Sequence, residues 1–237
     1  MKTYNVSMII PTRNEEKIVV HNLEKINRYL KNSRIIRNYE ILVSDYSTDK
    51  TPEKIKELGR KNPKIRYIDA GKKGIGAGIL AGLKNSRLDY IVLYPIDLSW
   101  NFESIEKSIQ TLETHDIVLA SREHKNSITS RPMKRIAFSK IYNFIIKKAF
   151  GLKINDTQCN FAARRTDINK YINKLDSDSA FLQTQILIHA KKIGLSIIEI
   201  PAIVNDTRPD SKIDVLKDGT QMLKEIINEK LKCYESI

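Results

Sequence analysis

The sequence predicts an α/β domain whose central sheet is mostly parallel and flanked by helices. Two observations carry this prediction. Short apolar segments alternate with segments of helical period along the 237-residue chain, without a low-complexity linker or an internal repeat. With 41% hydrophobic residues, the chain can also bury one good core, so we expect a single domain over residues 1–237.

Five strands are predicted in the first half, each short, rich in β-branched or aromatic residues and bounded by turn residues. They cover residues 4–10, 40–44, 64–68, 90–94 and 116–120. Helices are predicted between them at 15–30, 52–58, 75–84 and 102–112. Thr51 and Pro52 supply a cap and a first-turn proline to the second helix.

After Ser121 the pattern becomes richer in helix. Helices are predicted at 134–150, 181–193 and 213–232, and one further strand at 196–200. The second half is therefore expected to elaborate the sheet instead of repeating the first half.

Polar residues directly follow the first two predicted strands. The first strand runs into P-T-R-N-E at 11–15, and the second into S-D-Y-S-T-D at 44–49. The carboxyl ends of parallel strands meet at one edge of a sheet, where open α/β sheets bind nucleotides. The sequence therefore predicts a ligand site at this edge.

Asp97 follows the predicted strand at 90–94 and is a further candidate for this site. A carboxylate there, beside Asp45, can ligate a hard cation that bridges substrate phosphates. The alternative is that Asp97 caps the following helix or turn. Trp100, the only tryptophan, is either a core residue or a stacking platform.

The segment G-K-K-G-I-G-A-G at 71–78 differs from a dinucleotide fingerprint, which follows the first strand and reads G-x-G-x-x-G. We expect its glycines to let the backbone pass close to a ligand or to open a helix, with Lys72 and Lys73 near an anion. A tight structural turn is the alternative.

The net charge of +13 has a local concentration. Between His124 and Asn155 there are eight lysines and arginines and no Asp or Glu. Such a run attracts phosphates on nucleic acid or on a membrane surface, although a solvated basic face is the simpler reading. We recognise no RNA- or DNA-binding module, so no nucleic-acid partner is expected.

Two cysteines, Cys159 and Cys233, are too few for a disulfide framework and too far apart for a metal knuckle, which favours a reducing cytosol. The first residues lack the features of a signal peptide, and no segment approaches the about 20 apolar residues of a transmembrane helix. The four histidines have no partner at catalytic or metal-binding spacing.

Six motifs, in order, resemble those of family 2 glycosyltransferases with the GT-A fold, and most resemble the dolichyl-phosphate mannose synthase group. P-T-R-N-E at 11–15 resembles P-T-Y-N-E, and S-D-Y-S-T-D-K-T at 44–51 resembles D-D-x-S-x-D-G-T. The glycine segment at 71–78 is similar to that of the family, A-S-R at 120–122 to G-S-R, and D-T-Q-C-N-F at 156–161 to D-T-Q-x-G-F. S-K at 211–212, after I-E-I-P at 198–201, resembles E-V-P followed by an S-K loop.

The resemblance implies an inverting transferase that moves a sugar from a nucleotide-sugar donor, with GDP-mannose favoured, to a polyprenyl or dolichyl phosphate. It implies that Asp97 is the catalytic residue and the last acid of a D-x-D element, holding Mg²⁺ or Mn²⁺ against the diphosphate. The residues that would cradle the donor nucleotide are Pro11, Arg13, Glu15, Asp45 and Ser47.

The implied acceptor is itself a phosphate, already ionised at neutral pH, so it needs positioning by cations more than a general base. The cations assigned to this task by the resemblance are Arg122, Arg131, Arg208 and Lys212. Residues 1–122 would then form a nucleotide-sugar-binding half, and residues 123–237 a half that faces the acceptor and the membrane.

The basic run can also form an amphipathic helix that lies on an anionic membrane. Its apolar residues at 136, 137, 141, 144, 145 and 150 alternate with cations at 134, 135, 140, 147 and 148. Alternatively, the apolar stripe packs on the sheet while the lysines face water. The resemblance implies a peripheral protein on the cytosolic face of the membrane, docked directly or through a small membrane-anchoring subunit.

The sequence departs from the family pattern where negative charge is expected. The family's D-A-D-L-Q is P-I-D-L-S at 95–99, so Pro95 stands where the first metal acid is expected. Ser44 replaces the first acid of the D-D pair, and Arg13 replaces a tyrosine. Gln183 and Gln185 stand where the family often has acids.

A cation held by Asp97 and the donor phosphates alone would bind more weakly, and Arg13 would partly replace its charge. Two alternatives therefore remain. One is a transferase that uses UDP-glucose or UDP-GlcNAc on another lipid or a glycan. The other is a catalytically weak subunit that binds a nucleotide sugar.

Overall fold

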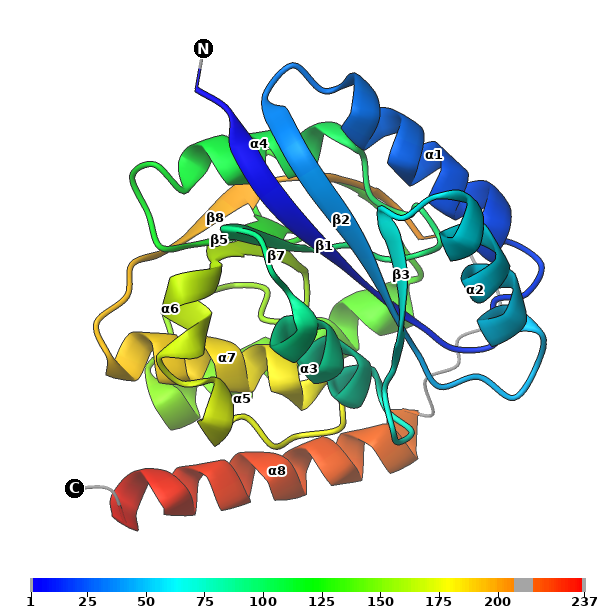
Figure 1. Ribbon diagram of the computed structural model, residues 1–237. Coiled ribbons are helices and arrows are strands. Elements are labelled where there is room, and N and C mark those ends of the chain that lie inside the picture. The colour runs from blue at the N-terminus through cyan, green and yellow to red at the C-terminus, as the bar shows by residue number, and fades with distance from the viewer. Residues whose placement is uncertain (1, 207–214, 236–237) are drawn as a thin grey trace.

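The computed structural model describes residues 2–206 and 215–235. Within them a seven-stranded sheet forms the centre of the molecule, in the order β3-β2-β1-β4-β7-β5-β8 (Figure 1). Its strands are β1 (Tyr4–Thr12), β2 (Ile36–Asp45), β3 (Ile65–Asp69), β4 (Tyr90–Leu93), β5 (Ile117–Ser121), β7 (Asn160–Arg164) and β8 (Ile197–Pro201). β7 runs antiparallel to β4 and β5, and the other neighbouring pairs are parallel. The predicted fold class is therefore confirmed.

Helices cover both faces of this sheet (Figure 1). One face carries α1 (Val19–Asn32), α2 (Thr51–Lys61) and α4 (Glu103–Thr111). The other carries α3 (Ile75–Asn85), the short α6 (Arg165–Asn169) and α7 (Phe181–Lys192). Beyond α7 lie α5 (Met133–Phe150) and α8 (Val215–Glu235), which contact one another. A 3₁₀ turn spans Ile172–Lys174, and a small parallel sheet joins β6 (Ile128–Ser130) to β9 (Ile203–Asn205).

The core is centred on β1 and β2. Met8, Ile9 and Ile10 of β1 are fully buried, as are Leu42 and Val43 of β2. Strands covered by helices on both faces need continuous apolar runs, which is how both segments read in the sequence. Because both faces of these strands are buried, the polar residues that follow them lie at the carboxyl edge of the sheet.

The strand order reverses between β1 and β4. From β1 the chain moves outward to β2 and β3, and it then returns to the other side of β1 as β4. Ile9 pairs with Leu93, and the Tyr94 N–H donates to the Ile9 carbonyl at 3.0 Å. The segments that follow β1 and β4 therefore leave the sheet side by side, at the type of crevice where open α/β sheets bind ligands.

The predicted elements differ from the structure at several points; β2 begins at Ile36 and not at residue 40, and the short helix α6 was not predicted. The first helix begins at Val19 and not at residue 15, because the backbone N–H groups of Glu15 and Glu16 donate to Thr51 and Asp49 of another loop. β6, β7 and β9 were not predicted. β7 has the sequence N-F-A-A-R, which lacks β-branched residues, and it is held by pairing with β4 and β5.

The helices in the described part of the chain are all too short or too polar to cross a lipid bilayer.

Candidate functional site

The loops that follow β1 and β2 are joined by hydrogen bonds at the crevice. The Asn14 N–H donates to the Ser47 hydroxyl at 2.7 Å, and the Thr48 N–H donates to the Asn14 side-chain oxygen at 2.9 Å. The Glu15 N–H donates to the Thr51 hydroxyl at 2.9 Å. These bonds place Arg13, Glu15 and Ser47, three of the predicted donor-binding residues, on two loops that hold each other in place, whereas Pro11 lies in β1 and pairs with Ser44.

Asp45 is the buried centre of this arrangement. Its Oδ1 accepts hydrogen bonds from the hydroxyls of Thr12 at 2.9 Å and Ser47 at 2.6 Å, and its Oδ2 accepts the Ser47 N–H at 3.1 Å. The residue is fully buried. Its carboxylate therefore holds the ends of β1 and β2 together, and the role in nucleotide binding predicted for Asp45 remains a prediction.

Backbone strain is concentrated at the same crevice. Among the described residues, the non-glycine positions with positive φ are Asn14, at 54°, and Leu98, at 56°. Asn14 follows β1 and Leu98 follows β4. Leucine adopts this conformation at a cost of about 1–2 kcal/mol, and such strain gathers at functional sites. Asn14 was not among the predicted site residues, although asparagine's tolerance of positive φ was an available signal.

The segment after β4 carries Asp97 at the edge of the crevice. Asp97 Oδ1 accepts the Ser99 N–H at 3.0 Å, and the side chain is partly exposed. Trp100 is only 8% exposed and belongs to the hydrophobic core, so it is not a stacking platform. The Tyr94 hydroxyl donates to the Trp100 carbonyl, and burial raises the pKa of Tyr94. The metal-binding and catalytic roles of Asp97 remain predictions.

The glycine segment opens α3, as predicted, but its close approach is to the chain's own backbone. A Cβ on Gly74 would lie 2.0 Å from the Asp178 carbonyl oxygen, and one on Gly76 would lie 2.3 Å from that of Ser179. The Gly76 N–H donates to the Asp178 carbonyl at 2.9 Å, and Lys72 forms an ion pair with Asp178 at 2.5 Å. The start of α3 therefore packs on residues 177–179, and a ligand anion near Lys72 and Lys73 stays a prediction.

Arg122, a predicted acceptor-phosphate residue, binds the fully buried Asp156. Arg122 Nε donates to Oδ2 at 2.7 Å and Nη2 to Oδ1 at 2.8 Å, and Nη2 also donates to the Gln158 carbonyl. Burial lowers the pKa of Arg122, but the charge of Asp156 outweighs it and raises that pKa. In turn, Arg122 holds the pKa of Asp156 below its usual range, against the effect of burial. The guanidinium fork is thus engaged within the fold.

Arg131 differs from Arg122 because part of its donor set remains available. Its side chain is 4% exposed, and Nη2 donates to Glu123 Oε1 at 2.7 Å. Its buried Nε has no hydrogen-bond partner among the described residues. Arg208 and Lys212, the other two predicted acceptor cations, lie outside the described residues.

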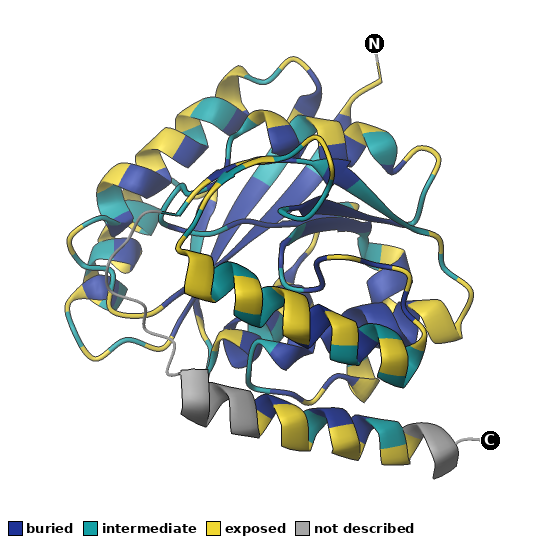
Figure 2. Ribbon diagram, turned by 180° about the vertical axis from the view of Figure 1, so that it is seen from behind, coloured by how far each residue is buried: buried dark blue, intermediate teal, exposed yellow. Residues whose placement is uncertain are grey.

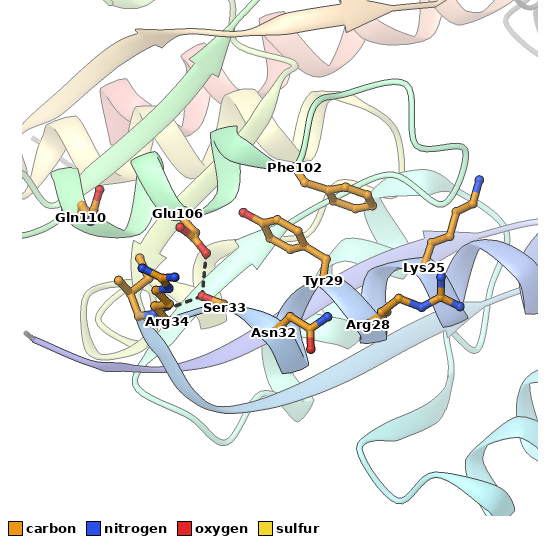
Figure 3. Close-up of a pocket in the computed structure, with 10 residues that line it drawn as sticks. Lys25, Arg28, Tyr29, Asn32, Ser33, Arg34, Phe102, Glu106 and Gln110 are labelled. Carbon is orange, nitrogen blue, oxygen red and sulfur yellow. Dashed lines mark hydrogen bonds between the residues drawn. The ribbon is translucent and has the colours of Figure 1, made fainter.

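A cavity of about 550 Å³ lies away from the crevice (Figure 3). Ser33, Arg34 and Ile35, just before β2 begins, line it together with parts of α1 and α4. Tyr29 and Phe102 stack within its wall, with ring centroids 4.8 Å apart. It opens near the amino end of β2, whereas the predicted site residues follow carboxyl ends of strands, so it is separate from the candidate site.

Residues 7–172 match the sequence model of glycosyl transferase family 2. The chain belongs to this family. Among its relatives, a dolichol-phosphate mannosyltransferase of Pyrococcus furiosus is 35% identical over 83% of this chain and 55% of its own length. The dolichyl-phosphate beta-glucosyltransferase ALG5A of Trichomonas vaginalis is 26% identical over 92% of this chain and 72% of its own. The glycosyltransferase AglD of Haloferax volcanii is 24% identical over 92% of this chain, which spans 36% of the length of AglD.

Solved structures agree with the expected GT-A architecture. Glucosyl-3-phosphoglycerate synthase from Mycobacterium tuberculosis, in complex with UDP, aligns with a TM-score of 0.70 at 16% identity. The alignment covers 96% of this family 2 chain and 80% of the synthase. The same synthase in complex with Mn²⁺, UDP-glucose and phosphoglyceric acid aligns with a TM-score of 0.67, also at 16% identity. At this identity the likeness establishes the fold.

Proposed function

We propose that this chain is the catalytic domain of a glycosyltransferase that moves a sugar, with inversion, from a nucleotide donor to a polyprenyl or dolichyl phosphate. The observation that carries the proposal is the crevice between β1 and β4. There hydrogen bonds to Asp45 hold the loops after β1 and β2 together, and Asp97 follows β4, the strand that pairs with β1 on its other side. A rigid set of polar groups at this point of an open α/β sheet is suited to a nucleotide and its diphosphate.

A phosphate acceptor is already ionised at neutral pH and needs no general base. The names of the Pyrococcus and Trichomonas relatives point to the same acceptor class.

For the acceptor phosphate we assign Arg131 as the leading cation among the described residues. Its unpartnered Nε leaves a donor for a phosphate oxygen, whereas Arg122 is committed to Asp156. The assignment of Arg131 to the acceptor is in line with our proposal of a donor half over residues 1–122 and an acceptor half over residues 123–237.

For the donor we propose GDP-mannose, with UDP-glucose as the competing nucleotide sugar. The 35% identical Pyrococcus relative, named a mannosyltransferase, favours the first. The Trichomonas relative, named a glucosyltransferase, and the fold shared with a UDP-glucose complex favour the second. A transferase using UDP-GlcNAc, or one acting on a glycan or another lipid, is tested by the same experiment.

We further propose that the acceptor half lies on an anionic membrane at its cytosolic face, through α5 or through a small anchoring subunit. Ile141 and Phe144 of α5 are each 61% exposed, whereas Tyr142 and Ile146 of the same helix are buried. Exposed residues line the outer sides of α5 and α8 (Figure 2). The buried side of α5 packs against helices and not on the sheet, as the contacts with α8 and the hydrogen bond between Tyr142 and Thr184 of α7 show, and this packing accounts for only one apolar side of α5. The second side, next to lysines, suits a lipid surface.

The decisive experiment is transfer of radiolabelled sugar from a panel of GDP- and UDP-sugars to a short polyprenyl phosphate, with Mg²⁺, Mn²⁺ or a chelator. We expect product from one donor, and we expect Asp97→Ala to reduce transfer by at least about 100-fold, because it removes a charge placed against the diphosphate. Asp89→Ala, a surface carboxylate before β4, is the matched control and retains activity.

Nucleotide binding without product from any donor would contradict the transferase and favour the alternative of a weak nucleotide-sugar-binding subunit. The observation that favours this alternative is Pro95, which stands where the family pattern has a carboxylate.

A further inference from the structure

The cavity of about 550 Å³ between α1 and α4 is lined by one side of each helix. The lining residues of α1 stand at positions 25, 28, 29 and 32, and those of α4 with its N-cap at 102, 106 and 110, spacings that share one helix face. α1 packs on α2 and β2, whereas α4 packs on β4, β5 and β7. Different neighbours therefore hold the two helices, and a cavity remains between them. Its volume falls within the about 300–1,000 Å³ that is usual for small-molecule sites.

Positive charge predominates in this lining. Lys25, Arg28 and Arg34 line the cavity, and none of the three has an ion pair or a side-chain hydrogen bond with another described residue. Glu106, the carboxylate of the lining, accepts a serine hydroxyl at 2.6 Å. Glu103 lies outside the lining and accepts a side-chain amide at 3.0 Å. Three cations facing one carboxylate favour an anionic ligand, to which an arginine can donate two hydrogen bonds.

Stacked aromatic rings form the middle of the cavity wall. Tyr29 and Phe102 lie nearly parallel with ring centroids 4.8 Å apart, and Phe102 stacks in turn on Tyr94 at 5.6 Å. Tyr94 is buried and fixes the stack in the core, whereas Tyr29 and Phe102 are only partly buried and line the cavity. In Figure 3 these two rings lie between the cations of α1 at one end and Arg34 at the other. A fixed aromatic surface between cations suits a flat ring that carries an anionic group.

We propose that this cavity binds a small organic anion with a planar ring, an aryl phosphate or an aryl carboxylate, through Tyr29 and Phe102 and the cations on either side of them. The proposal does not depend on sugar transfer. The cavity opens near the amino end of β2, whereas the proposed donor crevice follows the carboxyl ends of β1 and β4.

The test is calorimetric titration of the whole protein with naphthyl phosphate and with naphthoate. We expect at least one of them to bind with a dissociation constant of about 1 mM or tighter. Inorganic phosphate lacks the ring and naphthol lacks the charge, so each is expected to bind at least about tenfold more weakly. Absence of saturable binding by both naphthyl anions overturns the proposal, as does equally tight binding of naphthol.

Variants of the lining test the contacts. Arg28→Ala combined with Arg34→Ala is expected to weaken binding by about tenfold or more, the value of one hydrogen bond to a charged group. Lys31→Ala combined with Arg37→Ala removes the same charge from exposed positions outside the lining and is the matched control. Phe102→Leu keeps an apolar side chain but removes the ring, and it is expected to weaken binding about threefold to tenfold. Circular dichroism checks that each variant is folded.

Backbone amide chemical shifts separate this cavity from the crevice. The naphthyl anions are expected to shift resonances of α1 and of the start of α4, and Arg13→Ala, in the crevice, is expected to leave their affinity unchanged. Shifts confined to the crevice or to α5 would show that the anion binds elsewhere and would overturn the proposal. An equal loss of affinity in the matched control would overturn it as well.

Discussion

Arg13 shows how one residue can alter the electrostatics of the crevice. It lies four positions beyond Ile9 in β1, and Asp97 lies four positions beyond Leu93 in β4, while Ile9 and Leu93 are paired. The register therefore places Arg13 and Asp97 on the segments that follow the carboxyl ends of neighbouring strands. An arginine fork there is suited to the oxygens of a diphosphate.

Arg13→Ala is expected to weaken binding of UDP or GDP by about tenfold, the value of one hydrogen bond to a charged group. UMP and GMP, which lack the second phosphate, should be affected much less, and Arg13→Lys should retain part of the affinity. Calorimetric titration measures all of these. An equal loss for mono- and diphosphates would contradict a contact with the diphosphate.

The sequence predicted the positions of single residues where they directly follow a strand, while their roles stay predictions. Asp45, Ser47 and Asp97 all lie at the predicted edge of the sheet, because strand ends could be read from the apolar runs. Arg122 was harder to interpret, because its partner Asp156 is 34 positions away in the sequence and the pair forms only when β5 and the segment before β7 come together. Sequence alone does not reveal which cations are already neutralised.

At the scale of elements, the pair of Arg122 and Asp156 joins the end of β5 to the segment before β7. The folded-state pKa of Asp156 is depressed, so its contribution to stability is present above the unfolded-state pKa of about 3.9 and is lost as the pH falls through the folded-state value. We expect the free energy of unfolding to decline below about pH 4 for this reason.

Arg122→Ala is expected to cost about 3–5 kcal/mol at pH 7, because it leaves the buried Asp156 without its counter-charge. The double variant Arg122→Ala with Asp156→Ala should be more stable than the single one. Urea unfolding between pH 3 and 7 measures both effects. Full stability of the single variant at pH 7 would show that the pair is not needed to join these segments.

The start of α3 depends on glycine for space. A Cβ on Gly76 would lie 2.3 Å from the Ser179 carbonyl oxygen and 2.6 Å from that of Ser177, so the backbone of one segment has to move. We expect Gly76→Ala to lower the free energy of unfolding by about 2 kcal/mol or more. A Cβ on Gly78, in the same helix, would lie 3.2 Å from the Pro11 Cβ and 3.5 Å from the Ser44 carbonyl oxygen, so Gly78→Ala should cost less. Thermal unfolding compares the two, and similar losses would contradict the role of residues 177–179.

The elements of the first half could be predicted because local pattern and tertiary structure agree there. Each strand from β1 to β5 is a short apolar run between turn residues. β7 could not be recognised, because Ala162 and Ala163 have little intrinsic preference for a strand and are fully buried by their neighbours. Its place between β4 and β5 is a property of the assembled sheet.

For the whole molecule, the alternation of strands and helices was enough to predict the architecture and the edge at which the site forms. It was not enough to predict the reversal at β4, which depends on which strand the chain returns to. Nor could amphipathic pattern decide which apolar residues of the basic run are buried. The structure separates them: Tyr142 and Ile146 face the core, and Ile141 and Phe144 face outward.

This separation makes the membrane proposal testable on the whole protein. Among the described residues, eight of the exposed large apolar side chains belong to helices and strands after residue 123, namely Ile128, Met133, Ile141, Phe144, Ile203, Leu223, Ile227 and Leu231. Exposed lysines of α5 at 134, 140 and 148 border the apolar residues of that helix. An apolar ridge bordered by cations binds anionic lipid through both burial and charge.

We expect the protein to sediment with vesicles that contain phosphatidylserine at low salt and to be released as the salt concentration rises, because each lysine near the surface contributes about 1 kcal/mol and salt screens it. Phe144→Glu with Ile141→Glu should abolish sedimentation. Ile193→Glu, at an exposed apolar position beyond the end of α7, is the matched control and should bind like the wild type. Failure of the wild-type protein to bind anionic vesicles at low salt would rule out direct docking through α5. The position of the active site relative to the proposed lipid acceptor would then have to be set by something other than α5.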